Sequence, residues 1–428
     1  MLDIKFIREE PEKVKQACKA KQVQVDIDKL LEIDKKTRKV LQETETLKAQ
    51  RNIITQEISK QKTLELIKQA QKIKEKINER EKILKNLNPE YQELLYAIPN
   101  PALDDVPEGK DESENVVLRE VSEKTKLDFK PKPHWEIGEE LDIIDTQRAG
   151  KVSGSRFGFL KGKGALLEFA LINFALENLN KENFIPIIPP ILIRPEMMGG
   201  MGYVKLKMTE RDKKIWQGEE MYFLRDDDLL LAGTSEQMIG PMHSKEIFEE
   251  KDLPKRYVGF SSCFRREAGA YGKDVRGILR VHQFDKVEMF IFSKPENAIK
   301  EHELMLSLEE SLMQKLEIPY RVVKMCTGDL GDPAASKYDI EAWFPGQNEY
   351  RETHSTSNCT DFQARRLNIR YRDSKDNELK FVYMLNGTAL AIGRTILAIL
   401  ENYQQKDGSV KIPNVLQKYL GFREVEKK

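Results

Sequence analysis

The sequence predicts an α+β protein in which a long helical arm precedes a larger domain built around antiparallel strands. Two observations indicate this fold class. Apolar residues recur every seven positions between residues 30 and 96, as they do in a coiled coil. Two extended runs joined by a Gly-containing loop, between Ser261 and Phe292, are typical of an antiparallel hairpin. A chain of 428 residues is long enough for two or three domains.

Composition excludes several classes of protein. The chain has 71 basic and 71 acidic residues, so contact with a nucleic acid needs local patches rather than a global field. No apolar run approaches the roughly 20 residues that span a bilayer, and the opening MLDIKFIREEPEKV lacks the apolar core of a secretory signal. The scattered cysteines contain no C-x-x-C pair, which argues against a disulfide framework or zinc site. We therefore expect a cytoplasmic protein with no membrane partner.

The N-terminal hundred residues are expected to be helical. A short helix is predicted within residues 1–28, followed by a seven-residue repeat from Ile33 to Ile54. A second apolar series runs from Leu66 to Tyr91 after a polar break near 59–63, which predicts an antiparallel coiled-coil arm over about 30–96. Lys and Arg are spread along both halves. A solvated coiled coil has the same pattern, so the arm alone favours a solvated surface over nucleic-acid binding.

The rest of the chain is divided by its prolines. A Pro-rich segment at 98–109 begins a charged linker that ends near 133 and holds a short edge strand at 115–120. A helix at about 165–179 and a strand interrupted by prolines, FIPIIPPILI, follow. The Gly-rich stretch before that helix lacks GKS or GKT and does not read G-x-G-x-x-G after a strand. A P-loop and a dinucleotide-binding fold are therefore excluded.

The predicted hairpin carries charges inside its strands. Arg265 and Glu267 are two positions apart, as are Lys286 and Glu288, so each pair is expected to share one face. An exposed sheet face with ion pairs would look similar. The apolar neighbours favour a different interpretation, because buried charges are costly unless a ligand matches them. A ligand with a phosphate, a carboxylate and an ammonium group would do so.

The hairpin also carries a resemblance to a known family. CFRREAG followed by RGILRVHQFDKVEMF resembles motif 2 of the class II aminoacyl-tRNA synthetases, in the version found in seryl-tRNA synthetases. FIPIIPPILI with its preceding helix resembles motif 1, and FVYMLNGTALAIGRTILAIL resembles motif 3. TGDLG, YDIEAW and SNCTDFQARR also match the seryl enzymes. The resemblance covers essentially the whole chain.

The resemblance implies a fold and a domain plan. It implies a mostly antiparallel sheet flanked by helices, with a tRNA-binding domain at 1–100, a linker at 101–133 and a catalytic domain at 134–428. Motif 1 implies a homodimer. The arm stands where these enzymes carry a helical arm along their tRNA, which reverses the preference for a merely solvated coiled coil. Basic residues along a rod suit recognition of RNA shape rather than sequence.

The resemblance also implies a reaction. ATP and L-serine would give seryl-adenylate, and serine would then pass to the 3′ end of tRNA(Ser), with Mg²⁺ as the cofactor and tRNA(Sec) as an open second acceptor. Neither step needs a protein nucleophile, in agreement with the absence of a Ser/His/Asp or Cys/His pattern. Catalysis is expected to rest on positioning and electrostatics.

Site residues follow by resemblance. The catalytic set is Arg265, Glu288 and Arg394. The serine-binding set is Thr234, Glu236, Arg265, Glu288, Asn386 and Thr388. The ATP-binding set is Arg265, Arg266, Glu267, Val281, His282, Gln283, Phe284, Glu352, Thr353, His354, Ser355 and Arg394. The metal-binding set is Glu352 and Ser355, since hard oxygen ligands suit Mg²⁺.

Plainer interpretations remain for several of these residues. Thr234 and Glu236 would also fit a helix-capping box, and Arg394 would fit an arginine reaching from a core helix to solvent. Arg266 stands where the family commonly has a small polar residue and is expected to face away from ATP. His354 departs from the family pattern, and Thr388 keeps the hydroxyl of the usual Ser.

Two rival functions are weighed against this reading. A synthetase-like paralogue that loads a carrier protein would be expected to lack a full arm, which this chain has. A tRNA-binding or regulatory protein with an inactive site is disfavoured because Arg265, Glu267, Glu288, Glu352 and Arg394 are all intact.

Overall fold

The computed structural model describes the whole chain except residues 209–213, 219, 269–275 and 428. It divides into two compact units. The first comprises Met1–Pro99 with Lys205–Gln217, and the second comprises Asn100–Val204 with Gly218–Lys428. No helix in the described part of the chain is long and apolar enough to cross a membrane.

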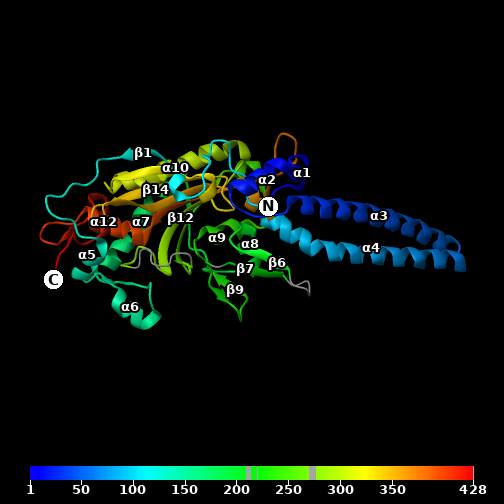
Figure 1. The fold of residues 1–428 in the computed structure, drawn as a ribbon, viewed down its shortest axis with the longest axis horizontal. Coiled ribbons are helices and arrows are strands. Elements are labelled where there is room, and N and C mark those ends of the chain that lie inside the picture. The colour runs from blue at the N-terminus through cyan, green and yellow to red at the C-terminus, as the bar shows by residue number, and fades with distance from the viewer. Residues whose placement is uncertain (209–213, 219, 269–275, 428) are drawn as a thin grey trace. The chain divides into compact units, whose positions relative to one another are not determined.

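The first unit contains the predicted arm. Helices α3 (Ile27–Lys60) and α4 (Leu64–Ala97) lie side by side as an antiparallel hairpin (Figure 1), which confirms the heptad prediction. The side chains of Asp26 and Thr63 accept backbone N–H groups at the starts of α3 and α4. The single helix predicted within 1–28 is two helices, α1 (Ile4–Glu9) and α2 (Pro11–Ala20). Pro11 begins α2, where its missing N–H costs no hydrogen bond.

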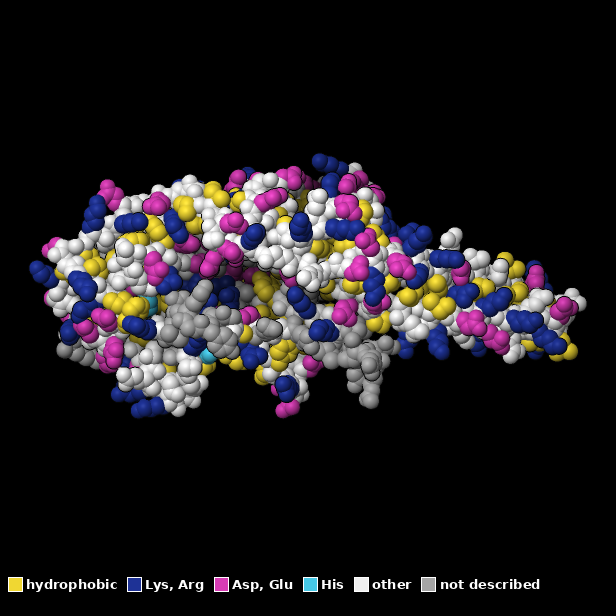
Figure 2. Space-filling model, in the orientation of Figure 1, with side chains coloured by type: hydrophobic (Ala, Val, Ile, Leu, Met, Phe, Trp, Pro, Cys, Tyr) yellow, Lys and Arg dark blue, Asp and Glu magenta, His cyan; other side chains and the backbone are white. Residues whose placement is uncertain are grey.

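The seam of the arm is polar in part. Thr44 is buried, and its hydroxyl donates to the Val40 carbonyl at 2.7 Å. Arg80 interrupts the apolar series of α4 and pairs with Glu43 of α3 at 2.7 Å. Figure 2 shows Lys and Arg interspersed with Asp and Glu along the visible face of the arm. Strands β6 (Lys205–Met208) and β7 (Lys214–Gln217) pair antiparallel in this unit.

The second unit is organised by one large sheet. Its strand order is β1-β13-β14-β15-β18-β12-β11-β4, and every described pair in it is antiparallel except β4 with β11. The predicted antiparallel sheet is therefore confirmed, with the Pro-containing strand β4 at one edge and the predicted edge strand β1 at the other. The bounds are β1 Val116–Val121, β4 Ile185–Ile187, β11 Lys255–Phe264, β12 Gln283–Ser293, β13 Tyr320–Lys324, β14 Ser336–Phe344, β15 Glu349–Asn358 and β18 Tyr383–Ala391.

Three helices pack on this sheet (Figure 1): α7 (Lys163–Lys181), α10 (Ala298–Lys315) and α12 (Ile392–Asn402). The core between them includes Phe174, Met305 and Ile396, all fully buried. The other elements are α5 His134–Glu140, β2 Ile144–Asp145, α6 Thr146–Ser153, β3 Phe159–Leu160, β5 Leu192–Ile193, α8 Pro195–Met201, β8 Phe223–Leu224, β9 Leu229–Leu231, α9 Glu236–Ile239, β10 Ile247–Glu249, α11 Phe362–Leu367, β16 Arg370–Arg372, β17 Leu379–Phe381, β19 Val410–Lys411 and β20 Glu424–Val425.

The predicted hairpin is the antiparallel pair β11–β12, but its strands are shorter than expected. β11 ends at Phe264, so Arg265 and Glu267 lie beyond it. Glu267 has a φ of 50°, so the alternation expected to place it on one face with Arg265 does not apply. The apolar run from Ile278 is not strand until Gln283. Gly269, Gly272, Lys273 and Asp274 of the predicted loop lie outside the described residues.

Candidate active site

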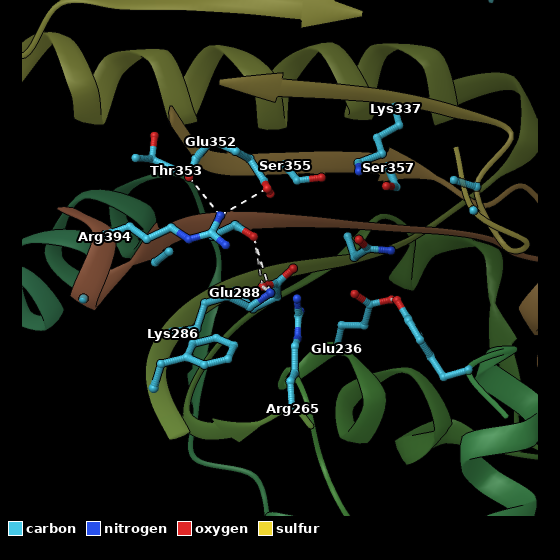
Figure 3. A pocket seen from close by; sticks show the side chains of 18 of the residues that line it. Glu236, Arg265, Lys286, Glu288, Lys337, Glu352, Thr353, Ser355, Ser357 and Arg394 are labelled. Atoms are coloured by element: carbon cyan, nitrogen blue, oxygen red, sulfur yellow. Dashed lines mark hydrogen bonds and ion pairs between the residues drawn. The ribbon is translucent and has the colours of Figure 1, made fainter. Parts of the chain in front are cut away.

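A pocket of about 280 Å³ opens where the central strands of the sheet meet the start of α12. Figure 3 shows charged side chains of both signs converging on it from β12, β14, β15 and α12. The pocket brings together twelve of the predicted site residues: Glu236, Arg265, Glu267, Val281, Phe284, Glu288, Glu352, Thr353, Ser355, Asn386, Thr388 and Arg394.

One end of the pocket holds a compact group of three side chains. Lys286 and Glu288 are two apart on β12 and both face the pocket, where they form an ion pair (Figure 3). Thr388 of β18 lies opposite Glu288 in the sheet register. Its hydroxyl is 3.4 Å from both Glu288 Oε2 and Lys286 Nζ. All three side chains are buried.

A second carboxyl group lies near them. Glu236 begins α9, is buried, and accepts a hydrogen bond from the Tyr203 hydroxyl at 2.6 Å. Burial, and then the charge of Glu288, raise the pKa of Glu236 to about 7, although the Tyr203 hydrogen bond acts in the opposite direction. Its side chain is therefore not the reciprocal partner of a capping box, because it faces the pocket instead of the helix start.

Arg265 lies between these carboxyl groups and an aromatic ring. Its guanidinium is centred 5.4 Å from the Phe284 ring, within cation–π range. Its Nε donates to the Gly233 carbonyl at 3.2 Å. The Glu267 carboxylate is 3.5 Å from Arg280 Nη1. The pocket thus presents a fixed cation beside a ring face.

The other end of the pocket holds Arg394 and Glu352. Arg394 Nη1 is 3.1 Å from Glu352 Oε2 (Figure 3). Burial raises the pKa of Glu352, but the charges of Arg394 and Lys337 outweigh it and bring that pKa to about 2. Arg394 therefore points into the pocket rather than out to solvent, and Glu352 is ionised at neutral pH.

Ser355 and Lys337 complete this end. Ser355 lies on β15 opposite Asp339 of β14, and Lys337 Nζ is 3.5 Å from Asp339 Oδ1. Burial raises the pKa of Asp339 to about 7, although Lys337 lowers it. Lys337 lies close to the carboxyl groups of Asp339 and Glu352, which offset its positive charge. An anionic ligand at this end would therefore need to bring a cation with it.

The residues present fit a magnesium ion, the metal that the sequence resemblance implies. Glu352 and Ser355 supply hard oxygen donors on the same strand, and both line the pocket. Among the described residues no group of three or more His, Cys, Asp and Glu side chains could form an all-protein cage. Two protein ligands suit Mg²⁺, which usually keeps waters and binds substrate phosphates.

Five predicted site residues do not line the pocket. Thr234 is buried, and its hydroxyl accepts the Glu236 N–H at 3.4 Å, so it supports the start of α9. His354 is buried beside Thr353, and burial lowers its pKa to about 4, so its ring is neutral. Arg266 is exposed. The remaining two are His282 and Gln283.

Sequence reasoning missed part of the lining. It noticed Lys286 as a charge in a strand but gave it no role, and it named neither Tyr203 nor Lys337. TGDLG was noted for its resemblance, and it supplies Leu330 and Gly331 to the pocket. The residues directly after it, which were not singled out, supply Pro333, Ala334 and Lys337. No pattern singled out Tyr203, which lies outside all three motifs.

Comparisons with known proteins agree with this geometry. The model of the "tRNA synthetase class II core domain (G, H, P, S and T)" matches residues 222–403, and that of the "Seryl-tRNA synthetase N-terminal domain" matches residues 1–102. The serine–tRNA ligases of Dictyoglomus turgidum and Dictyoglomus thermophilum are 46% and 47% identical to this chain, with 100% of each chain covered.

A solved structure gives the same result. The seryl-tRNA synthetase of Pyrococcus horikoshii, complexed with ATP, matches with a TM-score of 0.90 and 43% identity over 100% of both chains. With its antiparallel sheet, its paired helical arm and its full-length relatives, the chain belongs to the seryl-tRNA synthetase family of class II aminoacyl-tRNA synthetases.

Proposed function

We propose that this protein is a serine–tRNA ligase, which activates L-serine with ATP and transfers the seryl group to the 3′ end of tRNA(Ser). The observation that carries the proposal is the convergence in one pocket of Arg265, Arg394, Glu352, Glu236 and Glu288. Full-length relatives named serine–tRNA ligase support it, as does a structural relative complexed with ATP.

ATP is assigned to the end of the pocket that holds Arg394 and Glu352. Arg394 would bind the γ-phosphate through its permanent charge and forked donors. Arg265 would bind the α-phosphate, and Phe284 would stack on the adenine. Glu352 and Ser355 would hold Mg²⁺, which supplies charge neutralisation to the phosphates when it is bound.

L-Serine is assigned to the other end. Its carboxylate would face Arg265, its ammonium group Glu236, and its hydroxyl Glu288 and Thr388. A carboxylate oxygen of serine attacks the α-phosphorus, and pyrophosphate leaves with the electrons of the broken P–O bond. A hydroxyl of the terminal ribose then attacks the seryl carbonyl, and AMP leaves. Fixed cations beside the phosphates stabilise charge in both steps without a protein nucleophile.

The tRNA is assigned to the arm. Lys and Arg side chains along α3 and α4 can neutralise backbone phosphates and read the shape of a duplex. We propose the division into a tRNA-binding part at 1–100, a linker at 101–133 and a catalytic part at 134–428. We further propose a homodimer formed through the motif 1 segment, and action in the cytoplasm, where tRNA is charged. Charging of tRNA(Sec) is a second candidate activity.

The test is serine-dependent exchange of pyrophosphate into ATP, measured beside charging of tRNA(Ser). Both are compared between the full chain and a variant lacking the arm. We expect exchange by both proteins and charging by the full chain alone. Exchange that depends on another amino acid would overturn the substrate assignment, and full charging without the arm would overturn the role of the arm.

A further inference from the structure

Lys286 is a buried cation with no role in the reaction described above. Its side chain faces the pocket from the middle of β12 and is 7% exposed. A buried ammonium group is costly unless it is paired. The partners of Lys286 are Glu288 Oε2, in an ion pair, and the Thr388 hydroxyl at 3.4 Å. Lys286 therefore contacts both residues that would receive the serine hydroxyl, Glu288 and Thr388.

The two carboxyl groups of the serine end differ in their neighbours. Glu288 already shares one carboxylate oxygen between a cation and the Thr388 hydroxyl. Glu236 accepts a hydrogen bond from a neutral phenol, that of Tyr203. An incoming ammonium group would have to compete with Lys286 for Glu288, whereas at Glu236 it would meet no cation in direct contact among the described residues.

We propose that Lys286 is a specificity-determining positioning residue, which commits Glu288 to accepting the substrate's hydroxyl and leaves Glu236 to bind its ammonium group. This inference rests on the proposed function and deepens it. Lys286 acts through Glu288, because its ammonium group pairs with one carboxylate oxygen and fixes the orientation of the other. The serine hydroxyl then donates a hydrogen bond to a carboxylate that is held in place.

This arrangement makes discrimination against alanine depend on a lysine that need not touch the substrate. A buried acceptor with charge rejects an analogue that lacks the hydroxyl, because the acceptor would be left unpaired. Without Lys286, Glu288 can turn toward the substrate's ammonium group. The hydroxyl would then lose its dedicated partner, while the amino group would lose nothing.

The test compares two inhibitors that differ in this hydroxyl, the sulfamoyl analogues of seryl-adenylate and alanyl-adenylate. Their inhibition constants are measured in the wild-type protein and in Lys286→Met, whose unbranched side chain lacks only the terminal ammonium group in length and carries no charge. We expect the alanyl-to-seryl ratio to fall at least tenfold, with the alanyl analogue changing less than threefold. Lys286→Arg, which restores a cation, is expected to keep the ratio within threefold of the wild type.

Lys294→Met is the matched control. Lys294 follows β12, pairs with Glu250 and Glu296 at 2.8 and 3.0 Å, and does not line the pocket, so the ratio should not change. Equal weakening of both inhibitors by Lys286→Met, or an unchanged ratio, would overturn the proposal. Should Lys286→Met fail to fold, Lys286→Leu carries the same test, because it also removes the cation that pairs with Glu288. Absence of serine-dependent exchange in the wild-type protein would instead reject the proposed function itself.

Discussion

Arg394 holds Glu352 by both its backbone and its side chain: Nη1 lies 2.9 Å from the carbonyl oxygen and 3.1 Å from Oε2. The residue assigned to the γ-phosphate and the residue assigned to Mg²⁺ thus form an ion pair with each other before substrate binds. When ATP binds with its metal ion, two contacts would replace this ion pair: Arg394 would bind the phosphate, and the Glu352 carboxylate would bind the ion.

Replacement of Glu352 by Gln should therefore raise the requirement for Mg²⁺. The amide is a weaker ligand than the carboxylate, so the Mg²⁺ concentration for half-maximal pyrophosphate exchange should rise at least about tenfold. Glu349→Gln, at an exposed position on the same strand, should leave that concentration unchanged. A variant at Glu352 that is slower but has the wild-type Mg²⁺ requirement would contradict the assignment. Chelation of Mg²⁺ should abolish exchange in the wild-type protein.

Serine binding should depend on pH through Glu236. Its pKa of about 7 means that the carboxyl group is largely protonated below neutrality, when it cannot pair with an ammonium group. The KM for serine should therefore fall as pH rises from 6 to 8, while the KM for ATP should not follow it. Steady-state exchange across this range measures both.

Tyr203→Phe should displace that profile. The Tyr203 hydroxyl stabilises the ionised form of Glu236 through a hydrogen bond of 2.6 Å, so its removal raises the pKa of Glu236 further. The fall in the KM for serine should then occur at higher pH. The same midpoint in both proteins would show that another group controls the profile.

Asp34 should be important for the stability of the arm's base. It is buried and accepts hydrogen bonds from Arg8 at 2.7 and 2.9 Å and from Arg38 at 3.0 Å. Burial raises the pKa of Asp34, but these arginines lower it by more. Asp34→Asn should reduce the free energy of unfolding at pH 7 by about 2 kcal/mol, somewhat less than for a fully buried pair because both arginines are partly exposed.

The pH dependence gives the check. Because the folded pKa of Asp34 is lowered, its contribution is present above the unfolded value and is lost as pH falls through the folded one. The difference between Asp34→Asn and the wild type in urea unfolding should therefore shrink in acid. Asp28→Asn removes an exposed partner of Lys15, so it should change the free energy of unfolding little. An equal cost for both variants would contradict the role of burial.

A buried carboxyl group lies on the other side of the sheet from the pocket. Glu309 of α10 is fully buried, and neither carboxyl oxygen has a hydrogen-bond partner among the described residues. Burial raises the pKa of Glu309 well above its ordinary value, and Glu288 and Asp339 add to the effect. At a pH where Glu309 is ionised in the unfolded chain, its carboxyl group takes up a proton on folding. The folded state is therefore favoured less by this group as pH rises. Glu309→Gln should thus be stabilising relative to the wild type at pH 8, with little difference at pH 4.

The adjacent glycine offers a companion measurement. A Cβ on Gly387 would lie 2.8 Å from Glu309 Oε1 and 2.9 Å from Thr356 Oγ1. Gly387→Ala should lower the free energy of unfolding by about 1–3 kcal/mol. It should also reduce exchange, since the neighbours of Gly387 on β18 are Asn386 and Thr388, which line the pocket. Unchanged stability would show that β18 and α10 can separate without cost.

The arm was predictable because a coiled coil requires apolar residues every seven positions along the contact between its helices. The pocket was predictable where charges interrupt apolar strands, as Lys286 and Glu288 do. Arg265 and Glu267 both line the pocket, but strand alternation is not the cause, because the strand ends at Phe264. Tyr203 could not be predicted, since it is 33 residues away from Glu236 in the sequence and only the folded structure brings the two side chains together.

The pairing of β12 with β18 sets the order in which the site can be assembled. Glu288 and Thr388 are exactly opposite in register yet a hundred residues apart in the chain. Closing so long a loop is slow compared with forming the α3–α4 hairpin, whose contacts are local. During synthesis the arm can fold while β18 is still absent, and β12 must wait with one side unpaired. Ribosomes that stall between these two strands would therefore release chains that present an open, apolar strand edge, which is the form most exposed to aggregation and to chaperone capture.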